Sequence, residues 1–126
     1  MDNDSQENTT QDSQVTLKGL VKDFFSKKYL FQELSNSVVG NSGQKWNFDA
    51  LITTKNDAQY GVFIKDWNRS IGINQVRLLE KACIDCKFDG GLIIGNVFSS
   101  HAKSYGANKG VQVVLKGDIV RKIRGY

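Results

Sequence analysis

Two polar residues interrupt apolar segments in the middle of the chain, and their types fit hydrolytic chemistry. Asp49 stands between Phe48 and Ala50, and Lys65 directly follows the apolar residue Ile64. A carboxylate can hold Mg²⁺, and a nearby ammonium group can orient a water molecule and offset the charge that develops when a phosphodiester is hydrolysed. The same two residues also fit a salt bridge at the ends of two strands. Spacing alone leaves both interpretations open.

Two neighbouring strands joined by a short polar turn would position this pair. The first strand is predicted over residues 45–52 and the second over residues 60–65, with turn residues at 55–59. Alternation along the first strand predicts that one face carries Trp46, Phe48, Ala50 and Ile52. The second strand is a continuous apolar run, which is typical of a strand buried on both faces.

Hydrophobic periodicity predicts the remaining elements. An amphipathic helix starts at Leu17 after Thr16, a plausible N-cap, and ends near Lys28. After the strand pair, the chain is predicted to form a helix over 73–87, a strand over 92–95, a helix over 99–108, a strand over 111–115 and a helical turn within 118–126. Residues 29–39 are predicted to be extended or irregular. A hairpin followed by alternating helices and strands predicts an α/β fold with a mixed central sheet flanked by helices.

The charge is distributed unevenly along the 126 residues. Residues 1–14 hold four of the 13 acidic residues and none of the 17 basic ones, and we expect them to form a disordered acidic tail. The single predicted domain, residues 15–126, therefore carries 17 basic residues against nine acidic ones. A compact domain with this excess favours polyanions such as nucleic acid.

Several functional classes lack their motifs. The chain has one histidine, no G-x-S-x-G and no P-loop, which argues against a serine hydrolase and a P-loop ATPase. Cys83 and Cys86 are spaced C-x-x-C, but they supply only half of a four-thiolate zinc site, and we expect them to be ordinary helix residues. No membrane partner is expected, because no apolar run is long enough to cross a bilayer. Since no signal-peptide pattern is present, a cytoplasmic location is expected.

The ordered set of motifs resembles the restriction-endonuclease-like superfamily, also called PD-(D/E)xK, and within it the Mrr-type branch and its archaeal-like relatives. That superfamily carries an acid on one hairpin strand, as at Asp49, and an acid-x-Lys motif on the next, ending here at Lys65. The branch has a Gly-x-Ser-Gly…Phe-Asp stretch, an aliphatic strand, a Phe-Ser-x-x-Ala helix start and a final apolar strand. These resemble residues 40–49, 90–94, 98–102 and 110–114. The resemblance covers residues 15–117 and implies a restriction-endonuclease-like fold.

This chain departs from the pattern at Phe63, which occupies the position of the acid in acid-x-Lys. A phenylalanine cannot bind a cation. The resemblance therefore implies two alternatives: a Mg²⁺-dependent DNA endonuclease, with Asp49 as metal ligand and Lys65 positioning water, or a catalytically degenerate module that binds DNA or a protein partner without cleaving. Other acids are candidates to replace the missing metal ligand: Glu80, Glu33 and Asp66.

Residues suited to nucleic-acid binding are predicted around the same strands. They are basic side chains, small loop residues and hydroxyls near a helix N-terminus, which is favourable for anions. The candidates are Ser42, Gly43, Lys45, Arg69, Arg77, Ser99, Ser100 and Lys103. DNA is the expected partner, and a homodimer is expected because such folds often bind duplexes in pairs. A small interaction protein whose basic surface has no role in nucleic-acid binding is the third hypothesis.

Overall fold

The computed structural model describes residues 16–123. Its centre is a five-stranded mixed sheet with the order β1-β4-β5-β6-β7. The strands are β1 (Leu30–Glu33), β4 (Ala50–Thr53), β5 (Gln59–Lys65), β6 (Gly90–Gly95) and β7 (Val111–Leu115). The first two pairings, β1 with β4 and β4 with β5, are antiparallel, and the pairings of β5 with β6 and β6 with β7 are parallel. The mixed central sheet expected from the sequence is therefore confirmed. The predicted acidic tail, residues 1–14, lies outside the described residues.

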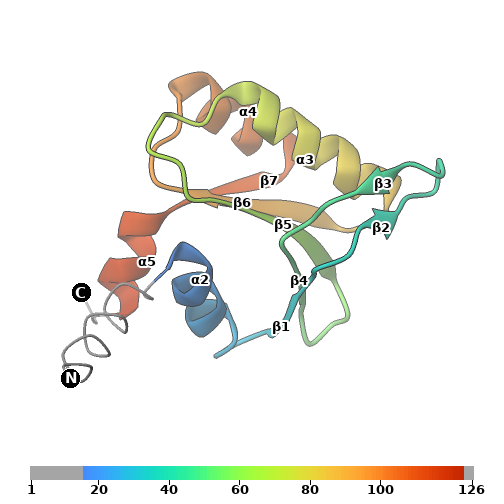
Figure 1. Cartoon of the computed structure of the whole chain (residues 1–126), viewed down its shortest axis with the longest axis horizontal. Coiled ribbons are helices and arrows are strands. Elements are labelled where there is room, and N and C mark those ends of the chain that lie inside the picture. Colours follow the sequence, from blue (N-terminus) through green and yellow to red (C-terminus); the bar gives the residue numbers. More distant parts are fainter. Residues whose placement is uncertain (1–15, 124–126) are drawn as a thin grey trace, which may run out of the picture.

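Helices cover both faces of the sheet (Figure 1). The helices α3 (Ile73–Asp85) and α4 (Ser100–Lys109) lie on one face, and α2 (Leu17–Phe25) and α5 (Lys116–Ile123) lie on the other. The predicted N-cap at Thr16 is confirmed, since its side chain accepts a hydrogen bond from the backbone N–H of Gly19 at 3.0 Å. The C-terminal segment, predicted as a single helical turn, forms the eight-residue α5.

Two hydrophobic cores follow from this layering. Phe63, Val76 and Leu79 belong to the core beneath α3 and α4, while Val62 and Ile64 belong to the core beneath α2 and α5. The apolar run of β5 is thus buried on both faces, as predicted. Removal of these side chains from water is the main contribution to the free energy of folding.

The predicted strand over residues 45–52 is wrong in one respect, because it is two strands in two different sheets. The strand β3 (Lys45–Trp46) pairs only with the short β2 (Val38–Val39), and the main sheet resumes at Ala50. As a result, Trp46 and Phe48 enter the core under α3, whereas Ala50 and Ile52 enter the core under α2. The side chains therefore change from one face of the sheet to the other at Asp49. At this residue both the backbone N–H and the carboxylate form hydrogen bonds with β5.

A loop-closing network holds the β2–β3 hairpin against the end of α3. The carboxylate of Asp85 accepts hydrogen bonds from the backbone N–H of Ser42 at 2.9 Å, from its hydroxyl at 2.7 Å, and from Nε1 of Trp46 at 2.7 Å. Gly43, at the tip of this hairpin, has a φ of +91°, a conformation that favours glycine. Hydrogen bonds from Ser42 and Trp46 lower the pKa of Asp85 below its usual value.

Candidate nucleic-acid interface

Asp49 lies one residue before β4, at the open end of the β4–β5 hairpin, where it faces the neighbouring strand β5. Its backbone N–H donates to the carbonyl oxygen of Val62 at 2.9 Å, and its Oδ2 accepts from the backbone N–H of Ile64 at 2.7 Å. Its other carboxylate oxygen lies 3.6 Å from Nζ of Lys18 on α2. The carboxylate therefore closes the hairpin end and faces a lysine that the sequence analysis did not single out.

Phe63 fills the position next to Asp49 with a buried ring. The side chain is 3% exposed, and the ring centroid lies 5.9 Å from that of Phe48. The register pairs Ala50 with Val62, so Asp49 and Phe63 are neighbours across the two strands. An acid in a PD-(D/E)xK motif would stand at this place. Here the position contributes to the core beneath α3.

Lys65 is held by aromatic rings rather than by Asp49. Its Nζ lies 4.8 Å from the ring centroid of Phe63 and 5.6 Å from that of Trp67. The guanidinium carbon of Arg69 lies 4.2 Å from the Trp67 ring. Within the described residues the cation paired with Asp49 is Lys18. We call the four side chains Phe63, Lys65, Trp67 and Arg69 the cation–aromatic stack.

The loop after β5, which carries Trp67 and Arg69, is fixed by the segment after β6. The side-chain amide of Asn96 donates to Oδ1 of Asp66 at 3.1 Å and to the carbonyl oxygen of Trp67 at 2.8 Å. A bridge between Ile71 and Phe98 ties the same two loops together. The stack therefore sits where the parallel strands β5 and β6 end, the edge at which α/β sheets commonly bind ligands.

The candidate replacement acids are separated in space. Glu80, on α3, accepts a hydrogen bond from the hydroxyl of Tyr105 on α4, and this bond raises the pKa of Tyr105. Asp66 is bonded to Asn96, as described above. Glu33 alone lines the same cavity as Asp49, and it forms an ion pair with Lys22 at 3.4 Å.

A magnesium ion would have to compete with lysines for the carboxylates near the hairpin end. Mg²⁺ takes oxygen ligands in near-octahedral geometry, usually with one or two carboxylates from the protein. The carboxylates nearest to the hairpin end, Asp49 and Glu33, each face a lysine. Among residues 16–123, no group of three or more His, Cys, Asp or Glu residues is placed to hold a metal ion. Asp49 and Glu33, which line one cavity, are therefore the carboxylates left to hold the ion that the resemblance implied, and each would first have to release its lysine.

The remaining predicted binding residues are spread over several elements. Ser42 donates both its backbone N–H and its hydroxyl to Asp85, while Lys45 is exposed on β3. Ser99 is the N-cap of α4 and accepts from the backbone N–H of Ala102 at 3.1 Å, and Ser100 begins the helix. Two basic side chains lie along the outer helices: Arg77, 5.3 Å from the ring of Tyr105, and the exposed Lys103.

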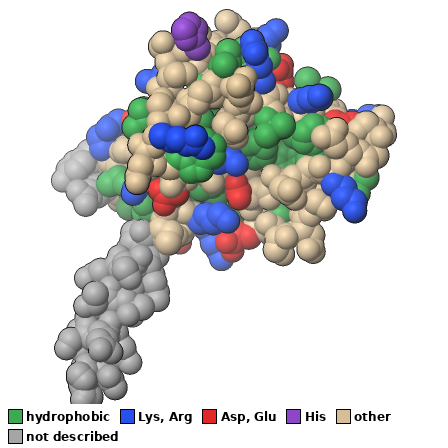
Figure 2. Space-filling model, turned by 45° about the horizontal axis from the view of Figure 1, so that its top comes forward, with side chains coloured by type: hydrophobic (Ala, Val, Ile, Leu, Met, Phe, Trp, Pro, Cys, Tyr) green, Lys and Arg blue, Asp and Glu red, His purple; other side chains and the backbone are tan. Residues whose placement is uncertain are grey.

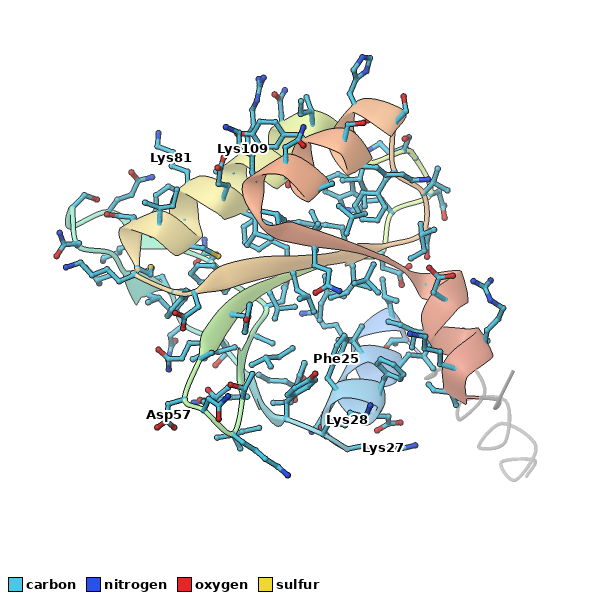
Figure 3. The ribbon with its side chains drawn as sticks, turned by 180° about the vertical axis from the view of Figure 1, so that it is seen from behind. Phe25, Lys27, Lys28, Asp57, Lys81 and Lys109 are labelled. Carbon is cyan, nitrogen blue, oxygen red and sulfur yellow. The ribbon has the colours of Figure 1, made fainter. Side chains whose placement is uncertain are left out.

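On the face that Figure 2 shows, Lys and Arg side chains are scattered rather than gathered in one stripe. Figure 2 shows them spread over one face, with acidic side chains among them. Figure 3 shows Lys81 and Lys109 on α3 and α4 and Lys27 and Lys28 near the end of α2, on opposite sides of the sheet. Position relative to the strand ends, rather than charge alone, therefore singles out the cation–aromatic stack.

Both cysteines are free thiols: Cys83 lies on α3, and Cys86 is the C-cap residue of that helix. Cys83 is buried, and desolvation raises its pKa to about 12. Desolvation also raises the pKa of Cys86. A raised thiol pKa lowers the fraction of reactive thiolate, which fits the expectation that these are ordinary helix residues.

The described residues form an α/β domain with a mixed central sheet flanked by helices, in which Asp49 directly precedes β4 and Lys65 ends the neighbouring antiparallel strand β5. No family model matches the chain, and no curated protein matches it. Its structure is similar to the crystal structure of AF1548, a protein of unknown function, with a TM-score of 0.72 and 17% identity. The likeness covers 86% of this chain and 66% of that one, and at this identity it concerns the fold alone.

A second solved structure has a lower likeness. It is a repair endonuclease from Pyrococcus abyssi, with a TM-score of 0.48 and 12% identity, and the match covers 78% of this chain and 41% of that one. This chain thus spans two fifths to two thirds of the length of the two solved chains. In the described residues, no helix combines the length and apolar character needed to cross a membrane.

Proposed function

We propose that this domain binds DNA through its phosphates, with the cation–aromatic stack at the centre of the contact, and that it does not cleave the DNA. The observation that carries the proposal is the position of Lys65 over Phe63 and Trp67, with Arg69 over Trp67. Both cations lie at the ends of the parallel strands. There they can contact a backbone that crosses this edge of the sheet.

The aromatic faces favour binding in a second way. A free lysine or arginine loses considerable side-chain entropy when it is held against a phosphate. Contact with the rings already restricts Lys65 and Arg69, so that less entropy remains to be lost on binding. The excess of basic residues over residues 15–126 adds a long-range attraction for a polyanion.

Phe63 and the partners of Asp49 are the reasons for proposing binding without cleavage. A buried ring stands at the acid position, and the carboxylate of Asp49 is already bonded to Ile64 and faces Lys18. Lys65, the residue expected to position water, lies over two rings. This arrangement supports the catalytically degenerate alternative of the sequence analysis.

Salt-dependent binding tests the proposal. Fluorescence anisotropy of a labelled 20-base-pair duplex should give an affinity that falls linearly with salt on logarithmic axes between about 50 and 200 mM. Each of Lys65→Ala and Arg69→Ala should reduce the salt slope by about 1. Lys55→Ala, in the turn at the other end of the β4–β5 hairpin, is the matched control and should leave the slope unchanged. No binding at low salt would overturn the proposal.

A Mg²⁺-dependent endonuclease remains the second candidate, because Glu33 and Asp49 line one cavity. Supercoiled plasmid incubated with Mg²⁺ or Mn²⁺ distinguishes the two. Nicking that disappears in Asp49→Ala would establish the endonuclease and reject the non-cleaving proposal. An intact plasmid with both ions supports binding alone. A homodimer on the duplex is a further prediction, which the stoichiometry of the complex in sedimentation would check.

A further inference from the structure

A cavity of about 610 Å³ opens beside Asp49, on the α2 side of the hairpin end. It lies between α2, the end of β1 and the segment that leads into β4. Asp49 connects it with the proposed DNA-binding edge, since its Oδ2 is bonded to the N–H of Ile64, the residue before Lys65. The cavity and the cation–aromatic stack therefore lie on either side of the same hairpin end.

The charges around this cavity balance. Asp49 faces Lys18 at 3.6 Å, and Glu33 faces Lys22 at 3.4 Å. A phosphate group entering here would meet two carboxylates whose lysines are already paired. Burying a phosphate next to carboxylates is unfavourable, so the cavity suits a neutral ligand better than an anion.

The other lining groups offer hydrogen bonds and an apolar surface. Asn36 and Asn47 are exposed amides, and each has both a donor and an acceptor. Leu34 and Phe48 supply apolar contacts. Amides read the edge of adenine, and carboxylates accept from the exocyclic amino group of a base. Pockets of this size accept ligands comparable to a nucleoside.

We propose that this cavity receives a nucleobase that has left the DNA helix, with preference for a base that carries an exocyclic amino group. The inference rests on the proposed DNA binding at the cation–aromatic stack. Phosphates on either side of the extruded nucleotide contact Lys65 and Arg69, and the base enters between Asn36 and Asn47. The preferred ligand is thus DNA with an unpaired adenine, cytosine or guanine rather than a fully paired duplex.

Three labelled duplexes of the same length test this preference: one with a central extrahelical adenine, one with an extrahelical thymine, and one with an extrahelical abasic residue. The abasic duplex reproduces the bend without the base. Wild-type protein should bind the adenine duplex roughly tenfold more tightly than the abasic one, with thymine in between, because a well-formed base contact is worth about that factor.

The double variant Asn36→Ala/Asn47→Ala tests whether the preference for adenine arises in this cavity. Both side chains are exposed, so we expect the variant to fold and to bind fully paired DNA as the wild type does. It should lose the preference for adenine. Asn108→Ala, an exposed asparagine on α4, is the matched control and should keep it.

The outcomes separate this inference from the proposed function. Equal affinity for the adenine and abasic duplexes, with salt-dependent binding of both, overturns the base cavity and leaves the DNA-binding proposal standing. A preference for adenine that survives in the double variant overturns the assignment to this cavity. Absence of binding to all three duplexes overturns both.

Discussion

The ammonium nitrogen of Lys65 lies 4.8 Å from the ring centroid of Phe63, two residues earlier in β5. In the acid-x-Lys motif that this strand resembles, an acid would stand at the position of Phe63. Here the same spacing produces a cation–π contact, worth about 0.5–1 kcal/mol at an exposed site. The partner of the lysine at this spacing is thus an aromatic ring and not a carboxylate.

Phe63→Ala should destabilise the domain by about 3–5 kcal/mol, because it removes a ring that is 3% exposed and leaves a cavity against Phe48. Urea unfolding followed by circular dichroism measures the change. Leu78→Ala, at a side chain that is 42% exposed on α3, is the control and should change the free energy of unfolding by about 0.5 kcal/mol or less. Equal effects of the two substitutions would contradict the burial of Phe63.

The two tryptophans should report DNA binding unequally. Trp46 is 5% exposed and bonded to Asp85, whereas Trp67 is half-buried within the proposed interface. Addition of duplex DNA should change the intrinsic fluorescence of the wild type and of Trp46→Phe, and leave that of Trp67→Phe unchanged. A fluorescence change that is lost in Trp46→Phe and kept in Trp67→Phe would show that the DNA binds elsewhere on the domain.

Asp85 should make stability depend on pH in the acid range. Its pKa in the folded protein is lowered, first by the hydrogen bond from Ser42 and then by that from Trp46. A lowered carboxyl pKa contributes stability that is fully present above the value in the unfolded chain and is lost as the pH falls through the folded value. The stability difference between wild type and Asp85→Asn should therefore be largest near neutral pH and shrink below about pH 4.

Thermal melts at a series of pH values measure that difference. Asp89→Asn is a demanding control, because Asp89 also accepts a backbone hydrogen bond, from Gln59, but takes no part in the network of Asp85, Ser42 and Trp46. A difference between wild type and Asp85→Asn that stays constant from pH 7 to pH 3 would show that the network does not depend on the ionised carboxylate.

Gly61→Ala should destabilise the hairpin. A Cβ at this position would lie 2.5 Å from a ring carbon of Phe48 and 3.0 Å from Sγ of Cys83. Overpacking of this kind costs about 1–3 kcal/mol. Gly117→Ala in α5 has its nearest neighbour at 3.8 Å and should be neutral or stabilising, because alanine favours a helix. Chemical denaturation of both variants gives the comparison, and a stabilising Gly61→Ala would show that Phe48 can move aside.

Local sequence patterns were sufficient for the parallel half of the fold. The apolar runs of β5 and β6 and the periodic stripe of α3 correspond to buried residues, since burial of each element is visible in its own spacing. The apolar run of β7 suggested a buried strand as well, but only Val111 of that strand is fully buried. The division of residues 45–52 into two strands was not predictable in the same way. The alternation of Trp46, Phe48 and Ala50 continues through the break, and only hydrogen bonds from Asp49 to the distant β5 reveal it.

In the candidate site, too, the contacts between residues distant in the sequence could not be predicted. The residue types at Asp49, Phe63 and Lys65 were visible in the sequence. Their partners were not, because Lys18 approaches Asp49 from a helix 31 positions earlier, and Trp67 approaches Lys65 from a loop held by Asn96. Contacts that depend on tertiary packing leave no local pattern. The amphipathic spacing of α2 placed Lys18 on an outer face without indicating which acid it would meet.

The hydrogen bond between Asp49 and Ile64 also bears on the order in which the domain assembles. It spans 15 positions and closes the β4–β5 hairpin, whereas the pairing of β5 with β6 must wait for the chain to pass through α3. Closing a short loop costs less chain entropy than closing a long one. We therefore expect the hairpin, with Asp49 already bonded, to be present in the folding transition state, and the parallel strands to add to it afterwards.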